Sequence, residues 1–125
     1  MDTASSNYEK LLKELTDLIP GAISASLTGV DGIGIAFYNI DPAFDPTLAD
    51  AEFATMLATA NRAAQSLAVG DISELIFSTQ KITIILKMVG TDFYLEVGLQ
   101  AGMGNIGMAR MQMRRASEAF IKVLY

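Results

Sequence analysis

The chain has 125 residues, carries a formal net charge of −5 and contains neither cysteine nor histidine. A single domain of this length buries an adequate hydrophobic core without disulfide bonds. The absence of cysteine and histidine removes thiolate chemistry, the usual general base and the commonest metal ligand, which weighs against an enzyme. The acidic balance weighs against a nucleic-acid partner, because phosphate backbones repel negative charge.

No apolar run approaches the roughly 20 residues that span a bilayer, and the N-terminus MDTASSNYEK lacks the pattern of a signal peptide. We therefore expect a cytoplasmic protein without membrane insertion. One domain is predicted to occupy residues 1–125, with residues 1–5 as a short flexible tail.

The first helix is predicted in SSNYEKLLKELTDLIPG, where Ser6 is a candidate N-cap and Glu9 completes a capping box. Pro20-Gly21 ends this helix. Its expected core stripe consists of Tyr8, Leu11, Leu12, Leu15, Leu18 and Ile19.

Two strands with alternating side chains follow at 22–28 and 33–39, and the Asp31-Gly32 pair between them is typical of a hairpin turn. The acidic connection after the hairpin lacks the ligand spacing and central glycine of an EF-hand, so we expect no calcium site. We interpret Asp45 as a helix N-cap and Pro46 as the first residue of that helix. The acids considered were Asp41, Asp45, Asp50 and Glu52.

A helix predicted over 47–68 has two unlike sides. Its core stripe consists of Phe53, Met56, Leu57, Ala60, Ala64 and Leu67. The opposite side carries Ala51, Ala54, Thr55, Ala58, Asn61, Arg62 and Gln65. A solvated face normally carries many charges, whereas this one has a single arginine and small residues that allow another helix to approach. An ordinary alanine-rich exposed face is the alternative; we favour a contact surface.

Three more strands are predicted at 72–79, 81–88 and 93–100, before a last helix from about Asn105. The segment 72–79 is apolar on both sides through Leu75, Ile76 and Phe77, which is an aggregation hazard at a sheet edge unless something pairs with it. The last helix is expected to face the sheet through Ile106, Ala109, Met113, Ala116, Phe120 and Val123. The element order α-β-β-α-β-β-β-α predicts an α/β domain of the α+β type, a three-layer α/β/α sandwich with a mainly antiparallel sheet.

Gly102-Met-Gly104-Asn-Ile-Gly107 matches the dinucleotide-binding pattern G-x-G-x-x-G. Such a site needs a further parallel strand and an acidic residue about 20 positions later. No strand can follow this helix within the chain, and the position where the acidic residue is expected falls near Lys122. We interpret these glycines as structural: Gly102 and Gly104 for the turn, and Gly107 for close packing of the helix on the sheet.

The ordered set of these segments resembles the Roadblock (dynein light chain) domain family over residues 5–125. The likeness is carried by Pro20-Gly21-Ala22, by Asp31-Gly32, and by Asn105-Ile106-Gly107 with Arg110. The resemblance implies a five-stranded antiparallel sheet in the order 2-1-5-4-3, with the first and last helices on one face and the middle helix on the other.

The resemblance also implies a homodimer joined by the third strands and the middle helices, which are the two elements flagged above. The dimer-interface candidates are Ser73, Leu75, Ile76, Phe77, Ala54 and Ala58. Prokaryotic MglB-type members act on Ras-like small GTPases through a platform of paired middle helices. The corresponding partner-binding candidates are Thr55, Asn61, Arg62 and Gln65.

Family members are non-enzymatic, so the leading hypothesis is a homodimeric regulator or adaptor of a Ras-like small GTPase, with no cofactor, metal or catalytic residue. Arg62 as an arginine finger is the less favoured interpretation, because it is one arginine on a helix face. A second hypothesis is a structural scaffold that joins larger partners, as in dynein and Ragulator complexes. A distant third is a nucleotide-binding enzyme that uses Gly102–Gly107 with Lys87 or Tyr94.

Overall fold

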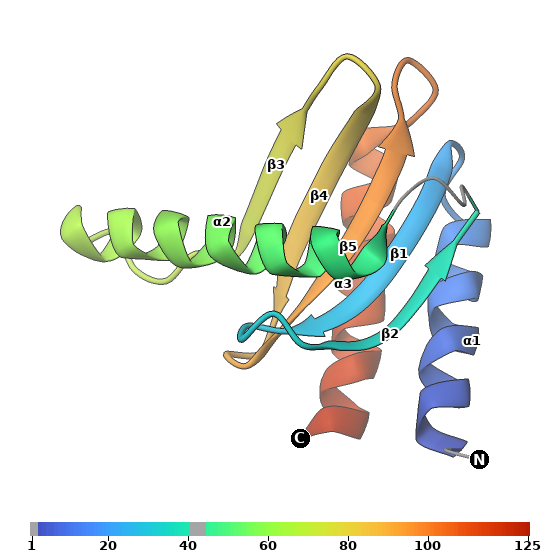
Figure 1. The fold of residues 1–125 in the computed structure, drawn as a ribbon, viewed down its shortest axis with the longest axis horizontal. Helices are drawn as coiled ribbons and strands as arrows, with labels where there is room; N and C mark the ends of the chain where they lie inside the picture. The colour runs from blue at the N-terminus through green and yellow to red at the C-terminus, as the bar shows by residue number, and fades with distance from the viewer. Residues whose placement is uncertain (1–2, 41–44) are drawn as a thin grey trace.

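The computed structural model describes residues 3–40 and 45–125, which form three helices and five strands (Figure 1). The elements in chain order are α1 (Thr3–Asp17), β1 (Ala22–Gly29), β2 (Gly34–Asn39), α2 (Pro46–Ser66), β3 (Glu74–Ser78), β4 (Ile82–Val89), β5 (Phe93–Gln100) and α3 (Ile106–Leu124).

The five strands form one sheet in the order β2-β1-β5-β4-β3, and all neighbouring strands run antiparallel. Helices α1 and α3 cover one face of the sheet and α2 crosses the other, which gives three layers (Figure 1). The predicted fold class and element order are confirmed, and so is the strand order that the resemblance implied.

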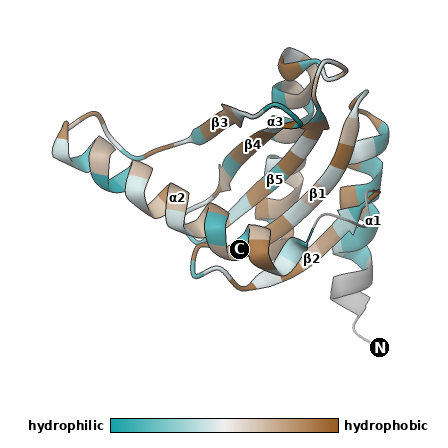
Figure 2. Ribbon diagram, turned by 45° about the horizontal axis from the view of Figure 1, so that its top comes forward, coloured by the Kyte–Doolittle hydropathy of each residue, from teal (hydrophilic) through white to brown (hydrophobic). Residues whose placement is uncertain are grey.

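Two hydrophobic clusters fill the spaces between the layers. The larger lies between the sheet and the α1 and α3 helices, where Leu12, Leu95 and Phe120 are almost wholly buried. The smaller lies beneath α2 and contains Phe53 and Tyr94. Figure 2 shows the hydrophobic positions gathered along the strands between these layers. Side chains alternate between the two faces of β5, so Leu95 enters the larger cluster and Tyr94 the smaller one.

The predicted start of α1 is wrong. The helix begins at Thr3, so Ser6 lies within it and is not its N-cap, and part of the tail expected at 1–5 is helical. Serine is tolerated inside a helix at a small cost, which allows this extra turn. Leu18, expected in the core stripe, lies beyond the last helical residue and is 55% exposed.

The predicted cap of α2 and the predicted start of α3 are confirmed. The Asp45 carboxylate accepts hydrogen bonds from the backbone N–H groups of Thr47 and Leu48, at 3.0 and 3.3 Å, and Pro46 follows in the first turn. The Asn105 side chain accepts from the Met108 N–H at 2.9 Å and begins α3. Within α3, Ile106 and Val123 do not face the core as predicted, since both lie in end turns of the helix and are exposed.

Candidate functional site

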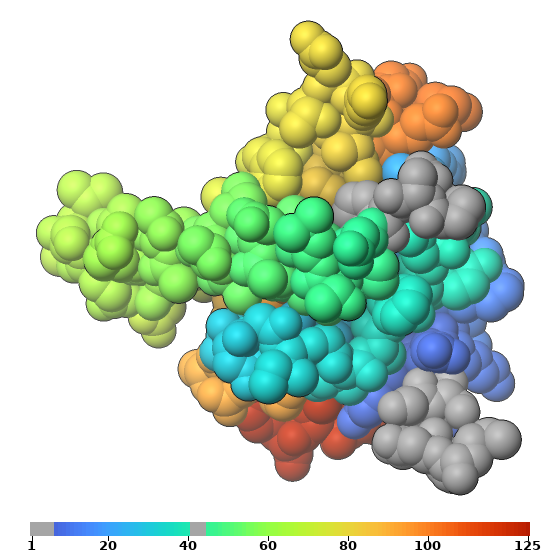
Figure 3. Space-filling view, viewed as in Figure 1, coloured from blue at the N-terminus to red at the C-terminus, as the bar shows by residue number. Residues whose placement is uncertain are grey.

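Helix α2 is packed against the sheet along its first half only. Its buried residues are Asp50, Phe53, Ala54 and Leu57, and no residue of this helix from Ala58 onward is buried. The second half extends past β3 and stands clear of the body of the protein (Figures 1 and 3). We call residues 58–69 the overhang.

The overhang ends in two large apolar side chains, Leu67 and Val69, each 72% exposed. The core stripe predicted for this helix is therefore wrong at Leu67, and Ala60 and Ala64 are only half-buried. The predicted side of the helix does face the sheet, but the sheet ends beneath the middle of the helix. A periodic sequence pattern shows which side of a helix is apolar and does not show how far the sheet beneath it extends. An apolar surface exposed in this way typically marks a contact with another molecule.

The first half of α2 is attached to the sheet by buried polar contacts around Asp50, whose exposed fraction is 8%. Thr28 on β1 donates its hydroxyl to the Asp50 carboxylate at 3.0 Å, and Tyr94 on β5 donates its hydroxyl to the Asp50 backbone carbonyl at 2.9 Å. Burial raises the pKa of the Asp50 carboxyl, and the hydrogen bond from Thr28 opposes this rise. These contacts hold the base of the overhang in place.

A second buried acid, Glu96, lies on the same face of the sheet. The hydroxyls of Ser24 and Ser26 donate to its carboxylate at 2.8 and 3.2 Å. Burial raises the pKa of Glu96 to about 7, although both serine hydrogen bonds oppose the rise. Sequence reasoning assigned no role to Glu96. The available signal was the alternate spacing of the two serines on β1 opposite an acid on β5.

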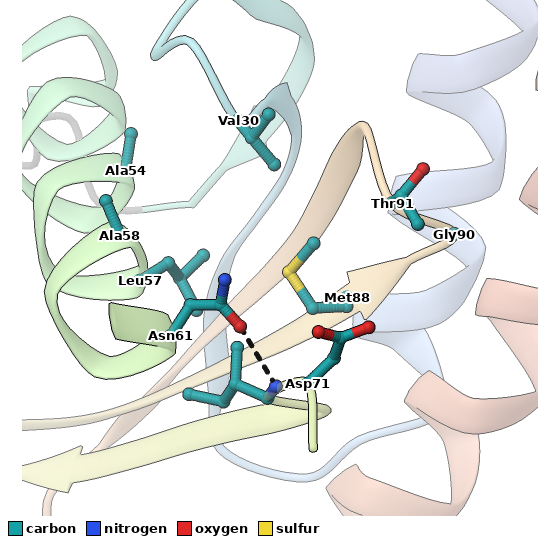
Figure 4. A pocket seen from close by; sticks show the side chains of 10 residues that line it. Val30, Ala54, Leu57, Ala58, Asn61, Asp71, Met88, Gly90 and Thr91 are labelled. Atoms are coloured by element: carbon teal, nitrogen blue, oxygen red, sulfur yellow. Dashed lines mark hydrogen bonds between the residues drawn. The ribbon is translucent and has the colours of Figure 1, made fainter. Parts of the chain in front are cut away.

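A pocket of about 420 Å³ lies between α2, the β4–β5 turn and the segment that follows the overhang (Figure 4). The Asn61 side-chain oxygen accepts a hydrogen bond from the Ile72 N–H at 3.2 Å. The Gln65 amide donates to the Asp71 carboxylate at 2.7 Å. Asn61 and Gln65, both predicted to bind a partner, therefore hold residues 71 and 72 against α2.

The remaining predicted residues on α2 divide into exposed and buried positions. Thr55, Ala58 and Arg62 are exposed, and Arg62 forms no salt bridge with any described residue. Ala54, predicted in the dimer interface, is instead packed in the cluster beneath the helix. Among the predicted residues of this helix, Thr55, Ala58, Arg62 and Gln65 are exposed in one protomer, and the Gln65 amide is already bound to Asp71.

Strand β3 is an edge strand and is shorter than predicted. Leu75 and Phe77 turn toward α2, and the Phe77 ring meets Phe53 edge-on with centroids 6.0 Å apart. Ile76 points to the opposite face and is 36% exposed. Ser73 precedes the strand, is exposed, and accepts a hydrogen bond from the Met88 N–H.

The backbone pairing of β3 leaves alternate residues facing the open edge. The Met88 N–H bonds to the Ser73 carbonyl at 2.9 Å and the Thr79 N–H to the Ile82 carbonyl at 2.8 Å. Because hydrogen-bonded and non-bonded pairs alternate in an antiparallel ladder, the backbone of Leu75 and Phe77 also points to β4. The N–H and C=O of Ile76 therefore point to the open edge.

The residues of the enzyme hypothesis do not converge. Tyr94 belongs to the cluster beneath α2, whereas Lys87 lies on the face that carries α3. Gly102 has a positive φ of 78°, as a turn requires, and a Cβ on Gly104 would lie 2.7 Å from Leu99. The explanation offered for Gly107 is wrong: it is exposed, and a Cβ there would approach only Asn105, at 3.4 Å.

The acids considered for calcium have separate positions. Asp45 caps α2, Asp50 is buried and Glu52 is exposed, while Asp41 lies outside the described residues. Within the described part of the chain, no group of three potential ligands has the geometry to hold a metal ion. No helix in that same part is long and apolar enough to cross a bilayer.

Solved structures with this architecture are known. A Roadblock/LC7 domain from Streptomyces avermitilis aligns with a TM-score of 0.85 and 16% identity, over 93% of this chain and 96% of that one. Myxococcus xanthus MglB aligns with a TM-score of 0.88 and 17% identity, over 99% and 92%. The chain has the Roadblock/LC7 fold.

MglC from Myxococcus xanthus is a further match to this Roadblock/LC7 fold, with a TM-score of 0.62 and 27% identity over 90% of this chain and 94% of that one. The sequence matches no protein-family model and no curated protein. The similarity to the Roadblock structures thus lies in the arrangement of elements far more than in residue identity.

Proposed function

We propose that the chain works as a homodimer whose two copies meet through β3 and the overhang. The observation that carries this proposal is the overhang itself, which presents Leu67 and Val69 to solvent beyond the last strand. Pairing of two β3 edges would extend each sheet beneath the other copy's overhang and cover these side chains. Among the structures with this fold is one described as MglB with a tetrameric arrangement, which supports self-association.

The proposed dimer is a non-enzymatic regulator or adaptor of a Ras-like small GTPase. The family resemblance implies this partner, and the likeness to the MglB fold supports it. The two α2 helices would form the docking platform, with Thr55, Ala58 and Arg62 of each copy facing the partner. Acceleration of hydrolysis, where it occurs, would come from positioning the GTPase's own loops.

The test is binding of the purified protein to the Ras-like GTPases of its own genome, each loaded with GDP or a non-hydrolysable GTP analogue. We expect one nucleotide state of one GTPase to bind preferentially. Binding in neither state by any of them would contradict the proposal. The regulator and the scaffold hypotheses use the same surfaces. If the bound protein leaves the rate of GTP hydrolysis unchanged, the scaffold hypothesis is favoured.

Arg62→Ala separates a docking residue from a catalytic one. We expect affinity to fall a few-fold while hydrolysis at saturation stays within about twofold, because loss of an arginine finger would lower it by about 10³ or more. Arg115→Ala removes the same charge from the opposite side of the protein and serves as the control. Saturable thermal stabilisation by a dinucleotide would revive the enzyme hypothesis instead.

A further inference from the structure

A second groove lies on the other face of the sheet, where α3 leaves the β3 edge uncovered. It has a volume of about 500 Å³, and its walls come from the N-terminal half of α3, the start of β3 and the end of β4. It is lined by Ser73, Glu74, Lys87, Gly107, Arg110, Met111 and Arg114. Since α2 lies across the opposite face, this groove is separate from the GTPase platform (Figure 1).

The groove is positively charged in an acidic protein. Lys87, Arg110 and Arg114 supply three cations against the single carboxylate of Glu74, whereas the whole chain has a net charge of −5. Arg110 forms a salt bridge with Glu74. Lys87 and Arg114 form no salt bridge with any described residue, so their charge is available to a ligand.

The cations are spread along the groove and do not converge on one point. Arg110 and Arg114 are four residues apart on α3, which separates them by about 6 Å along the helix axis. Alternate side chains of an extended peptide are about 6.7 Å apart. Met111 and the half-exposed Ile76 add apolar surface beside the charges. A compact anion such as phosphate would contact one or two of these cations and approach Glu74.

We propose that this groove binds an extended acidic segment of a partner protein, with carboxylates on alternate residues pairing with Arg110, Arg114 and Lys87. The peptide would lie along α3 above β3, with the side chains between its carboxylates directed away from the floor. The proposal stands on one protomer and does not depend on the dimer or on a GTPase.

The probe is a fluorescein-labelled peptide of about twelve residues in which glutamate alternates with threonine, titrated at low ionic strength where exposed charges are least screened. A peptide with glutamine in place of glutamate carries the same label and serves as its control. We expect saturable binding of the glutamate peptide alone, with NMR amide shifts concentrated at Ser73, Lys87 and Gly107.

Arg114→Glu and Arg115→Glu form a matched pair of variants. Both residues are exposed neighbours on α3 and the change in net charge is the same, but Arg115 lies in the groove between α1 and α3. We expect Arg114→Glu to weaken binding about tenfold and Arg115→Glu by less than about twofold. Equal weakening by both would show attraction to net charge alone and would overturn the proposal.

Glu74→Gln is expected to strengthen peptide binding, and a variant that failed to fold could not produce that result. Removing this carboxylate frees Arg110 and should tighten binding of the glutamate peptide about twofold to fivefold. Unchanged or weaker binding would contradict the proposed role of the groove. Competition by inorganic phosphate, or by vesicles of phosphatidylserine, at charge concentrations equal to the peptide's would identify a different ligand and would also overturn it.

Discussion

Thr28 on β1 and Asp50 on α2 are joined by a hydrogen bond of 3.0 Å between side chains that are both buried. The Tyr94 hydroxyl reaches the backbone of the same aspartate from β5. Asp50 lies in the second turn of α2, ahead of the residues that pass beyond the sheet. The contact therefore sets the direction in which the overhang leaves the protein.

Replacing Thr28 with valine should lower the free energy of unfolding by about 1–3 kcal/mol, because the shape is kept while the buried carboxylate loses its donor. Urea unfolding at fixed protein concentration measures this. Thr91→Val, at an exposed turn residue, should change it by less than about 0.5 kcal/mol. If Thr28→Val costs no more than this control, the hydrogen bond does not anchor α2.

Glu96 should make the protein less stable as pH rises. A pKa raised from 4.5 to about 7 means that the folded state retains a proton that the unfolded state releases within this range. The stabilising contribution is complete below pH 4.5 and is lost as pH rises through 7, by about 3 kcal/mol in all. Glutamine at this position does not titrate, and the serine hydroxyls can rotate to accept from its amide.

We therefore expect Glu96→Gln to match the wild type near pH 4.5 and to be more stable by about 2–3 kcal/mol at pH 8. The measured quantity is the difference in unfolding free energy between the two proteins at each pH, which cancels the other carboxylates. The exposed Glu118→Gln should show a small difference at both pH values. A Glu96→Gln difference independent of pH would contradict the burial of a titrating acid.

Ile76→Pro should dissociate the proposed dimer while leaving each protomer folded. The Ile76 N–H points to the open edge of β3, and proline is tolerated where an edge strand donates no bond to its neighbour. Phe77→Pro removes both an N–H that points to β4 and the ring that packs against Phe53, and should instead unfold the strand, at a cost of about 3 kcal/mol or more. Size-exclusion chromatography with light scattering and circular dichroism distinguish the two outcomes.

Ile76→Ala is the control for side-chain contacts, because it keeps the backbone donor. It should remain dimeric at concentrations where Ile76→Pro is monomeric. If proline at position 76 leaves the dimer intact, the protomers do not pair through the β3 backbone.

Leu67→Asp should weaken the dimer without destabilising the protomer, because the side chain is already 72% exposed before association. We expect the dissociation constant to rise about tenfold or more, since a charge would have to be buried against the partner's sheet. Met103→Asp changes an apolar residue that is 64% exposed in the β5–α3 loop and should have no effect. Analytical ultracentrifugation over a concentration series measures both, and equal behaviour of the two variants would remove the overhang from the interface.

The fold was predictable from the sequence because period, caps and turns agree along most of the chain. The caps at Asp45 and Asn105 are local features, with donors and acceptors within three residues. The site was predictable only in outline. Period alone assigned Leu67 to the core, and this is wrong because the sheet ends beneath the middle of α2. Ala54, which the family resemblance placed in the dimer interface, lies in the half of the helix that packs on the sheet.

The polar contacts beneath α2 were beyond the reach of local patterns. Thr28 and Asp50 are 22 residues apart in sequence, and Ser24 and Glu96 are 72 apart. Which hydroxyl meets which acid depends on the register of β1 against β5 and on the angle at which α2 crosses them. Neither is set by residues adjacent in the chain.

The mass of the purified chain in dilute solution tests the central claim most directly. Light scattering should give twice the 13.4 kDa of one chain at micromolar concentration, and the mass of one chain for Ile76→Pro. A well-folded wild-type protein with the mass of a single chain across the whole concentration series would mean that the overhang and the β3 edge are not covered by a second copy, and the proposed platform would not exist.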